Sequence, residues 1–262
     1  MDLTDPPSTL RAPGPHLLAL ESRAPVEAVI SLALWPLLTQ GPAGDGHTVL
    51  VFPGLAAPDA STVLLRHFLQ QRGYEPRCWE LGVNLGPRPG VFEACLQRVH
   101  DLQRESGRKI SVIGWSLGGI YARELAKLAP DAIRSVISLG TPFTGDPKAS
   151  NAWRLYEFAS GLKAGGHAAH HQFSVAPPMP TTSIFSRSDG VVNWRCSIQE
   201  AGPQTENIEV FASHGGLGMN PAALYAIADR LAQPEGEWQP FEPTGMVRWA
   251  YGSGRESESA PV

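Results

Sequence analysis

The chain has 262 residues, of which 42% are hydrophobic and 18% are charged, and its formal net charge is −4. This length and composition are typical of a globular protein and exclude a chain that is mostly disordered. The slight acidity, without any basic run, excludes binding to a phosphate backbone as the main function, so we expect no nucleic-acid partner. The three widely spaced cysteines indicate reduced thiols instead of a disulfide framework or a zinc site.

The first 46 residues precede the first predicted strand, and we interpret them as a helical extension. Residues 1–15 lack the basic start and the apolar run of a secretory signal, so we expect a cytoplasmic protein. Residues 26–38 are strongly apolar, but Glu27 and Pro36 interrupt them and they are shorter than the ~20 residues of a membrane-spanning helix. We expect no membrane span; a homodimer contact and contact with a lipid interface stay open as roles of residues 26–38.

From residue 47 onward, short apolar runs alternate with helical patterns. This alternation is typical of βαβ units, and it predicts an α/β fold with a mostly parallel sheet of about six strands flanked by helices. The expected strands are residues 48–52, 76–80, 110–113, 133–139, 182–185 and 208–211. The expected helices between and after them are residues 60–71, 91–105, 118–128 and 221–231.

The alternation is interrupted between the fourth and the fifth strand. Residues 149–163 have the pattern of an amphipathic helix, and residues 165–180 contain Gly-Gly, Pro-Pro and three histidines, which is typical of a loop. We interpret residues 144–180, approximately, as a lid inserted into a domain that spans residues 47–234. Residues 235–262 then form a C-terminal tail, whose end we expect to be disordered.

The sequence Gly114-Trp115-Ser116-Leu117-Gly118 has the pattern Gly-x-Ser-x-Gly. In a nucleophile elbow this pattern places the serine on a sharp strand-to-helix turn, where a side chain at either glycine would clash with neighbouring backbone. The bare pattern also arises by chance, but here a predicted strand precedes it and a predicted helix follows it. We therefore predict that Ser116 is a nucleophile.

A serine hydroxyl is a weak nucleophile, so it needs a base and an acid that orients the base. Asp189 follows the fifth predicted strand and His214 follows the sixth, which gives the chain order Ser, Asp, His. Asp146, which follows the fourth strand, is an alternative acid. The three histidines between residues 165 and 180 have no neighbouring Cys or acid, so we expect no metal site, and we expect no cofactor.

A tetrahedral intermediate also needs two N–H donors for its oxyanion. Leu117, directly after the nucleophile, is the first candidate because its N–H lies at the start of a helix. Leu55, in Pro53-Gly54-Leu55 after the first strand, is the second candidate, because the chain turns at Gly54 there. The sequence therefore predicts an oxyanion hole formed by the backbone N–H groups of Leu55 and Leu117.

At these residues the chain resembles bacterial lipases and esterases of the α/β-hydrolase superfamily. The resemblance covers residues 48–231 and includes Leu139-Gly140-Thr141-Pro142 and Ser188-Asp189-Gly190 besides the segments above. It implies a carboxylic ester hydrolase with Ser116 as nucleophile, Asp189 as acid and His214 as base. It also implies acyl esters as substrates, either small molecules or lipid-like esters, with medium acyl chains or polyesters among them.

Two positions depart from the family pattern, because Trp115 and Pro53 stand where it usually has His. We therefore expect an apolar mouth, with Trp115 and Phe143 lining the substrate pocket. Two other functions stay open. One is an acyltransferase or perhydrolase that uses the same triad, and the other is a non-catalytic binding or scaffold protein with a hydrolase fold.

Overall fold

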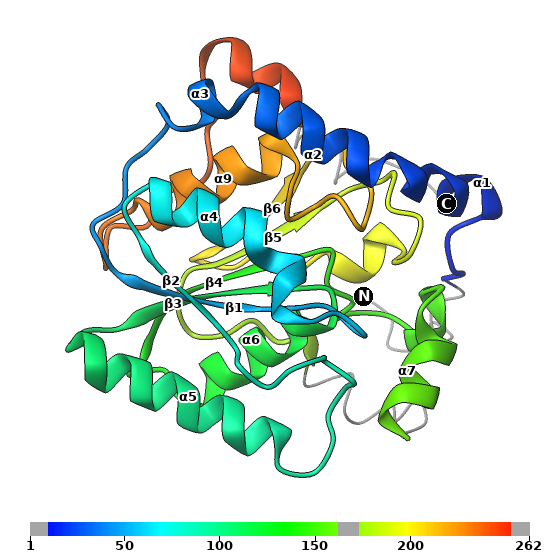
Figure 1. The fold of residues 1–262 in the computed structure, drawn as a ribbon, viewed down its shortest axis with the longest axis horizontal. Helices are drawn as coiled ribbons and strands as arrows, with labels where there is room; N and C mark the ends of the chain where they lie inside the picture. The colour runs from blue at the N-terminus through cyan, green and yellow to red at the C-terminus, as the bar shows by residue number, and fades with distance from the viewer. Residues whose placement is uncertain (1–9, 162–172, 253–262) are drawn as a thin grey trace.

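The computed structural model describes residues 10–161 and 173–252. In the described chain, six strands form one sheet in the order β2-β1-β3-β4-β5-β6, and every neighbouring pair is parallel (Figure 1). The strands are β1 (Thr48–Phe52), β2 (Glu75–Cys78), β3 (Ile110–Trp115), β4 (Ile133–Leu139), β5 (Thr181–Phe185) and β6 (Thr205–Glu209). The predicted α/β fold with a parallel sheet is confirmed.

Helices cover both faces of the sheet (Figure 1). On one face lie α4 (Val63–Gln71), which follows the short helix η2 (Asp59–Thr62), and α9 (Pro221–Leu231). On the other face lie α5 (Val91–Ser106) and α6 (Leu117–Leu128). Side chains of β3 alternate between the two layers, since Val112 packs with α5 and α6 whereas Ile113 packs with α4 and α9. Both faces of the sheet are therefore buried, as a parallel sheet requires.

The last strand lies earlier in the chain than the sequence pattern predicts. The apolar run 208–211 indicated a strand there, but β6 ends at Glu209 and the side chain of Phe211 is 73% exposed. β6 pairs only with β5 and forms an edge of the sheet, and edge strands carry polar residues. Apolar content therefore misplaced this strand by about three residues.

The segment after β4 begins with the short helix η3 (Pro147–Ala149) and continues as α7 (Trp153–Ser160), which is shorter than the predicted helix 149–163. Residues 162–172 of the predicted lid, with all three of its histidines, lie outside the described residues. After β5 the chain forms another short helix, η4 (Trp194–Ser197). The lid itself therefore stays a prediction.

The N-terminal segment forms α1 (Pro15–Leu20), η1 (Glu21–Arg23), α2 (Ala24–Ala33) and α3 (Trp35–Leu38), and α2 and α3 contact α9. In α2, Glu27 and Ser31 are buried, one turn apart, and Ser31 donates a hydrogen bond to the carbonyl of Met219. The outward side chains are apolar. Those at least 41% exposed in this segment are Leu18, Leu20, Val26, Val29, Ile30, Leu32, Leu34 and Leu37.

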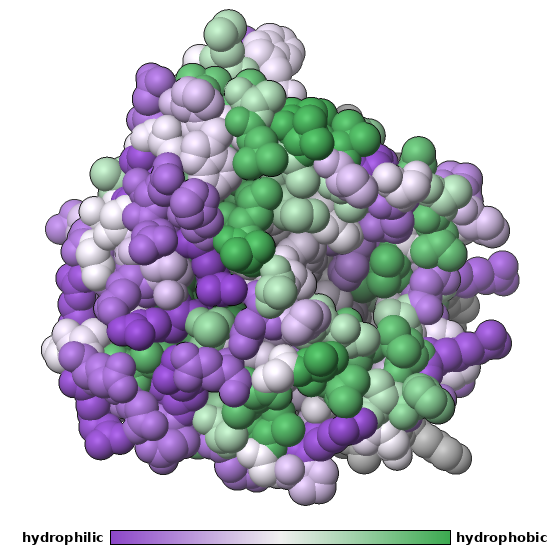
Figure 2. All heavy atoms as spheres, viewed as in Figure 1, coloured by the Kyte–Doolittle hydropathy of each residue, from purple (hydrophilic) through white to green (hydrophobic). Residues whose placement is uncertain are grey.

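Figure 2 shows hydrophobic surface where α2 crosses this face of the molecule. The polarity of α2 is thus the reverse of that of an ordinary surface helix, which buries its apolar side. No helix in the described ranges is both long enough and apolar enough to cross a bilayer.

The described part of the C-terminal tail folds back onto the sheet edge and α9. Val210 forms an isolated antiparallel bridge with Tyr251, which follows the short helix η5 (Gly245–Ala250). The hydroxyl of Tyr251 donates to the carbonyl of Ala222 at 2.9 Å, and its ring contacts Phe241 edge to face. The residues after 252, where we expect disorder, lie outside the described residues.

Candidate active site

Ser116 lies on the turn between β3 and α6, with φ 54° and ψ −120°. This conformation is strained for a residue with a side chain, and it persists only where the surroundings enforce it. Here the packing does so. A Cβ added to Gly114 would lie 2.3 Å from the carbonyl oxygen of Gly118, and one added to Gly118 would lie 2.4 Å from the carbonyl oxygen of Phe52. Only glycine fits at these two positions, so β3 and α6 meet in the geometry of a nucleophile elbow.

Backbone hydrogen bonds hold Ser116 in place on both sides. Its N–H donates to the carbonyl of Leu139 at the end of β4 at 2.8 Å, and its carbonyl accepts from the N–H of Gly119 at 3.0 Å. The loop after β1 lies against it, since a Cβ on Gly54 would be 3.5 Å from the Cβ of Ser116. Ser116 therefore lies where the carboxyl ends of β1, β3 and β4 meet.

The two predicted oxyanion donors flank this turn. Leu117 is the first residue of α6, and Leu55 follows Gly54 in the loop after β1. In the described structure neither backbone N–H donates to a protein acceptor. The N–H of Leu117 lies at the start of a helix, where negative charge is favoured, and the N–H of Leu55 is free in its loop.

Sequence reasoning missed the residue that holds the Leu55 loop. Asn84 is fully buried, and its side-chain amide donates to the carbonyl of Pro53 at 2.8 Å. Its backbone carbonyl accepts from Ala56 at 2.7 Å, and its backbone N–H donates to Ala57 at 3.0 Å. Asn84 thus forms hydrogen bonds with the backbone before Leu55, at Pro53, and after it, at Ala56 and Ala57. Its surroundings of turn residues gave no pattern from which this contact could be predicted.

Asp189 and His214 lie side by side on the loops that follow β5 and β6. The Nδ1 of His214 is 2.6 Å from Oδ2 of Asp189, and both side chains are buried. The other carboxylate oxygen, Oδ1, accepts from the N–H groups of Val191 and Val192, both at 2.8 Å. A carboxylate held in this way fixes the orientation of an imidazole ring.

The alternative acid, Asp146, does not reach the imidazole. It is exposed, and its carboxylate accepts from the N–H of Lys148 as the N-cap of η3. Of the two carboxylates proposed from the sequence, Asp189 is the one that contacts His214.

The surroundings of His214 set its pKa. Burial lowers the pKa because it disfavours the charged imidazolium, but the charge of Asp189, its hydrogen bond and the charge of Glu21 raise it. The net result is a pKa above the ordinary value of 6.5. The site therefore favours the protonated imidazole, which is the form a base takes after it has accepted a proton.

Trp115 and Phe143 are both buried, at 8% and 0% exposure, and make protein contacts. The indole N–H of Trp115 donates to the carbonyl of His214 at 3.0 Å, and the guanidinium of Arg123 lies 3.8 Å from the centre of the Phe143 ring. Burial lowers the pKa of Arg123 to about 10. That both rings line a substrate pocket stays a prediction.

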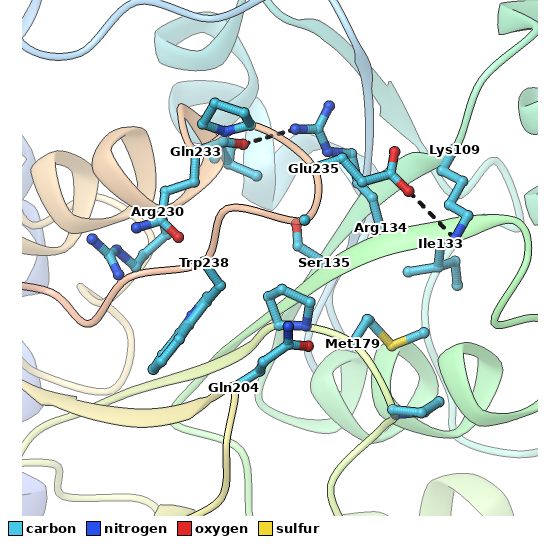
Figure 3. A pocket seen from close by; sticks show the side chains of 15 residues that line it. Lys109, Ile133, Arg134, Ser135, Met179, Gln204, Arg230, Gln233, Glu235 and Trp238 are labelled. Carbon is cyan, nitrogen blue, oxygen red and sulfur yellow. Dashed lines mark hydrogen bonds and ion pairs between the residues drawn. The ribbon is translucent and has the colours of Figure 1, made fainter.

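A separate cavity of about 200 Å³ opens beside the amino end of β4 (Figure 3). Ser135 lines it, together with Lys109 and Arg134. Lys109 pairs with Glu235 at 3.3 Å and Arg134 donates to the carbonyl of Gln233 at 2.8 Å, so both cations have partners within the cavity wall. Ser116 follows the carboxyl end of β3, which places the candidate site at the opposite edge of the sheet.

A metal site is absent from the part of the chain that the structure describes, in which no three His, Cys, Asp or Glu side chains gather. The absence of a metal and of a cofactor therefore stays a prediction for the whole chain.

Comparison with known proteins links this chain to others through structure alone. No family model and no curated protein match its sequence. A crystal structure of Aspergillus fumigatus lipase B matches with a TM-score of 0.57 and 17% identity, over 73% of this chain but 53% of the lipase. An α/β superfamily hydrolase from Oenococcus oeni matches with a TM-score of 0.51 and 15% identity, over 71% of this chain and 91% of the other.

A pyrethroid hydrolase also matches, with a TM-score of 0.50 and 17% identity over 74% of this chain and 99% of the other. These neighbours are all α/β-hydrolase enzymes. The protein therefore has the α/β-hydrolase fold, although it spans only about half the length of the lipase. At such low identity the likeness concerns the fold, and the chemistry has to be argued from the site.

Proposed function

We propose that this protein is a serine hydrolase that cleaves carboxylic esters through an acyl-enzyme. The observation that carries the proposal is the strained Ser116 elbow at the same sheet edge as the hydrogen-bonded pair of His214 and Asp189. Strand ends at the carboxyl edge of a parallel sheet are where α/β proteins bind ligands. Ser116, Asp189 and His214 follow β3, β5 and β6, whose carboxyl ends lie at this edge, and this placement supports the proposal.

In the proposed mechanism, His214 removes the proton of Ser116 as the serine oxygen attacks the ester carbonyl. The N–H groups of Leu55 and Leu117 stabilise the oxyanion, and Asp189 stabilises the imidazolium. His214 then protonates the leaving alcohol, and a water molecule repeats the cycle on the acyl-enzyme. Ser116 and His214 share no hydrogen bond in the described structure; such bonds are commonly loose before a substrate binds.

The substrate that this proposal favours is a small-molecule or lipid-like acyl ester. Leu55 and Leu117 are partly exposed beside the elbow and supply apolar surface for an acyl chain. A series of p-nitrophenyl esters from acetate to octanoate tests the preference, with kcat/KM highest for a medium chain as the expected result. A steady fall from acetate onward contradicts a medium-chain preference but leaves ester hydrolysis intact.

Covalent labelling with a fluorophosphonate probe tests the nucleophile. We expect the wild-type protein to be labelled and the Ser116→Ala variant to stay unlabelled. Ser111→Ala is the matched control, because Ser111 lies within β3, the strand that precedes Ser116, and is fully buried. Labelling of Ser116→Ala equal to that of the wild type would overturn the proposed nucleophile.

Two other functions remain as outcomes of experiments on the same site. An acyltransferase or perhydrolase uses the same acyl-enzyme but passes the acyl group to an alcohol or to peroxide, and product analysis with added alcohol separates it from hydrolysis. A binding or scaffold protein with this fold takes up no probe at Ser116 at all.

We also propose that the outward face of α2 and α3 makes a contact outside the chain, either with a second copy or with a lipid interface. Exposed apolar side chains such as Val29, at 64%, and Leu37, at 61%, favour such a contact. The double variant Val29→Ser, Leu37→Ser tests it. Sedimentation velocity without and with liposomes should show loss of a dimer or loss of liposome binding; a wild-type protein that is monomeric and unbound contradicts both.

A further inference from the structure

The N-terminal segment reaches the two loops that carry Asp189 and His214. In η1, the carboxylate of Glu21 accepts three backbone hydrogen bonds. Its Oε1 accepts from the N–H of Gly190 at 2.7 Å and from the N–H of His214 at 2.9 Å, and its Oε2 accepts from the N–H of Gly215 at 2.9 Å. The side chain of Glu21 therefore hydrogen-bonds both to Gly190, directly after Asp189, and to His214.

Glycines on the two loops let this segment approach closely. A Cβ added to Gly190 would lie 2.2 Å from the carbonyl oxygen of Leu17 in α1. One added to Gly216 would lie 2.0 Å from Oε2 of Glu27 in α2. Neither glycine has a positive φ, so close packing is the reason for glycine at both positions. The N-terminal helices are thus fitted against the loops instead of lying loosely over them.

An ion pair strengthens the same junction. Glu27 accepts from the N–H of Ser213 at 2.8 Å and pairs with Arg23 at 2.9 Å. Arg23 in turn donates to the carbonyl of Ser188 at 3.1 Å. The pair of Arg23 and Glu27 therefore binds Ser188, directly before Asp189, and Ser213, directly before His214. The charges of the two side chains cancel.

Among the described residues no Lys, Arg or His side chain forms an ion pair with Glu21, whose carboxylate accepts from three backbone N–H groups. The charged groups that face the His214 loop are thus Asp189, Glu21 and the neutral pair of Arg23 and Glu27. Of these, Glu21 adds a net negative charge that comes from outside the predicted triad.

We infer that Glu21 is a positioning residue of the active site, which holds the loops of Asp189 and His214 in register and stabilises the imidazolium by its charge. This inference rests on the proposed function, since it assigns Glu21 a role in the same reaction. Small displacements of a base lower the rate strongly, so a carboxylate that fixes two loops affects catalysis without touching the substrate.

The decisive variant is Glu21→Gln, which keeps the length of the side chain but removes its charge and turns one acceptor into a donor facing Gly215. We expect fluorophosphonate labelling to slow by about tenfold to a hundredfold. We also expect the acid limb of the rate against pH to move to lower pH, because the charge of Glu21 raises the pKa of His214 after burial has lowered it.

The matched control is Glu206→Gln, near the amino end of β6, the strand whose carboxyl end precedes the His214 loop. Glu206 also accepts a backbone hydrogen bond, from Phe241 at 2.8 Å, and pairs with Arg230 at 3.0 Å. A general loss of stability should affect both variants, whereas the pH shift should appear only in Glu21→Gln. An unchanged rate and an unchanged acid limb in Glu21→Gln would overturn the inference.

Two further measurements cover the other outcomes. If the wild type takes up no probe, the proposed function fails, but an NMR titration of the His214 ring still tests the role of Glu21. A lower pKa of His214 in Glu21→Gln than in the wild type supports the inference, and an equal pKa contradicts it. If Glu21→Gln does not fold, Glu21→Asp replaces it, since it keeps the charge but has a shorter reach. Slower labelling with a wild-type acid limb then supports the inference, and a wild-type rate contradicts it.

Discussion

The sheet carries a Ser, a His and an Asp at each of the two ends of its strands. In the described structure a hydrogen bond joins the Ser to the His at the amino end, whereas at the carboxyl end only the His and the Asp are hydrogen-bonded. At the carboxyl edge lies the candidate site. At the amino edge, His47 binds Asp45 through Nδ1, and its Nε2 is 2.8 Å from the hydroxyl of Ser111. Ser111 is also 2.8 Å from the hydroxyl of Ser135. By residue type and hydrogen bonding alone, this second array looks at least as complete as the first.

The two arrays differ in the backbone around the serine. Ser111 lies inside β3, is fully buried and uses its hydroxyl on two side-chain partners. Ser116 lies on a strained turn at the start of a helix, is partly exposed and has free N–H groups beside it. A nucleophile needs access to the substrate and N–H donors for an oxyanion, which is why the proposed nucleophile is Ser116 and not Ser111.

The pKa values of the two histidines are shifted in opposite directions. Burial and the charges of Arg134 and Arg108 lower the pKa of His47, and together they outweigh the opposing influence of Asp45. For His214 the neighbouring carboxylates outweigh burial, so its pKa is raised. His47 is therefore suited to stay neutral as part of the core, whereas His214 is suited to accept a proton.

The largest expected effect comes from replacing each of the two serines by alanine. Ser116→Ala should lower kcat/KM for an ester by roughly 10⁵-fold to 10⁶-fold, because the nucleophile is lost. Ser111→Ala should leave kcat/KM within about twofold but lower the free energy of unfolding by about 1–3 kcal/mol, since His47 loses a buried partner. Ester kinetics and urea unfolding measure both. Equal losses of activity in Ser116→Ala and Ser111→Ala would contradict the assignment of the active site to the carboxyl edge.

The two aspartates give the next largest contrast. Asp189→Asn should lower kcat by about 10⁴-fold, because the amide favours the wrong tautomer of His214. Asp45→Asn should act on stability alone, as its carboxylate pairs with His47 and Arg134 far from the elbow. Steady-state kinetics of both variants test this, and a strong loss of kcat in Asp45→Asn would contradict it.

The pH dependence of the wild type sharpens the comparison further. In the proposed mechanism neutral His214 is the base, so kcat/KM should fall about tenfold per pH unit below its pKa. Since that pKa is raised, the decline should begin above pH 6.5. A pH profile of ester hydrolysis measures it, and a rate that stays flat from pH 8 to about pH 5 would contradict His214 as the base.

The smallest effect concerns His47 and the pH dependence of stability. Its folded-state pKa is lowered, so its contribution to stability is present above the ordinary value of 6.5 and is lost as the pH falls toward the folded-state value. The stability difference between wild type and His47→Gln, about 1 kcal/mol at pH 8, should therefore shrink at low pH. Urea unfolding at several pH values measures it, and a constant difference would contradict the lowered pKa.

Much of the fold could be predicted from local patterns. The limits of β1, β4 and α9 agree with the predicted strands 48–52 and 133–139 and the predicted helix 221–231. These elements are apolar runs or amphipathic periods with clear ends. The edge strand β6 was misplaced, because an edge strand is defined by its pairing with β5 and has no continuous apolar run.

The sequence by itself determined the elbow, since Gly114 and Gly118 are local requirements of a tight turn, and it placed Asp189 and His214 after strands that end at one edge. Only the tertiary structure decided that Asp189 rather than Asp146 contacts His214, and that Glu21 holds their loops. Such contacts join residues far apart in the chain, so no local period records them. The N-terminal helices, which resemblance left outside the fold, are tied into the site by long-range hydrogen bonds to backbone N–H groups.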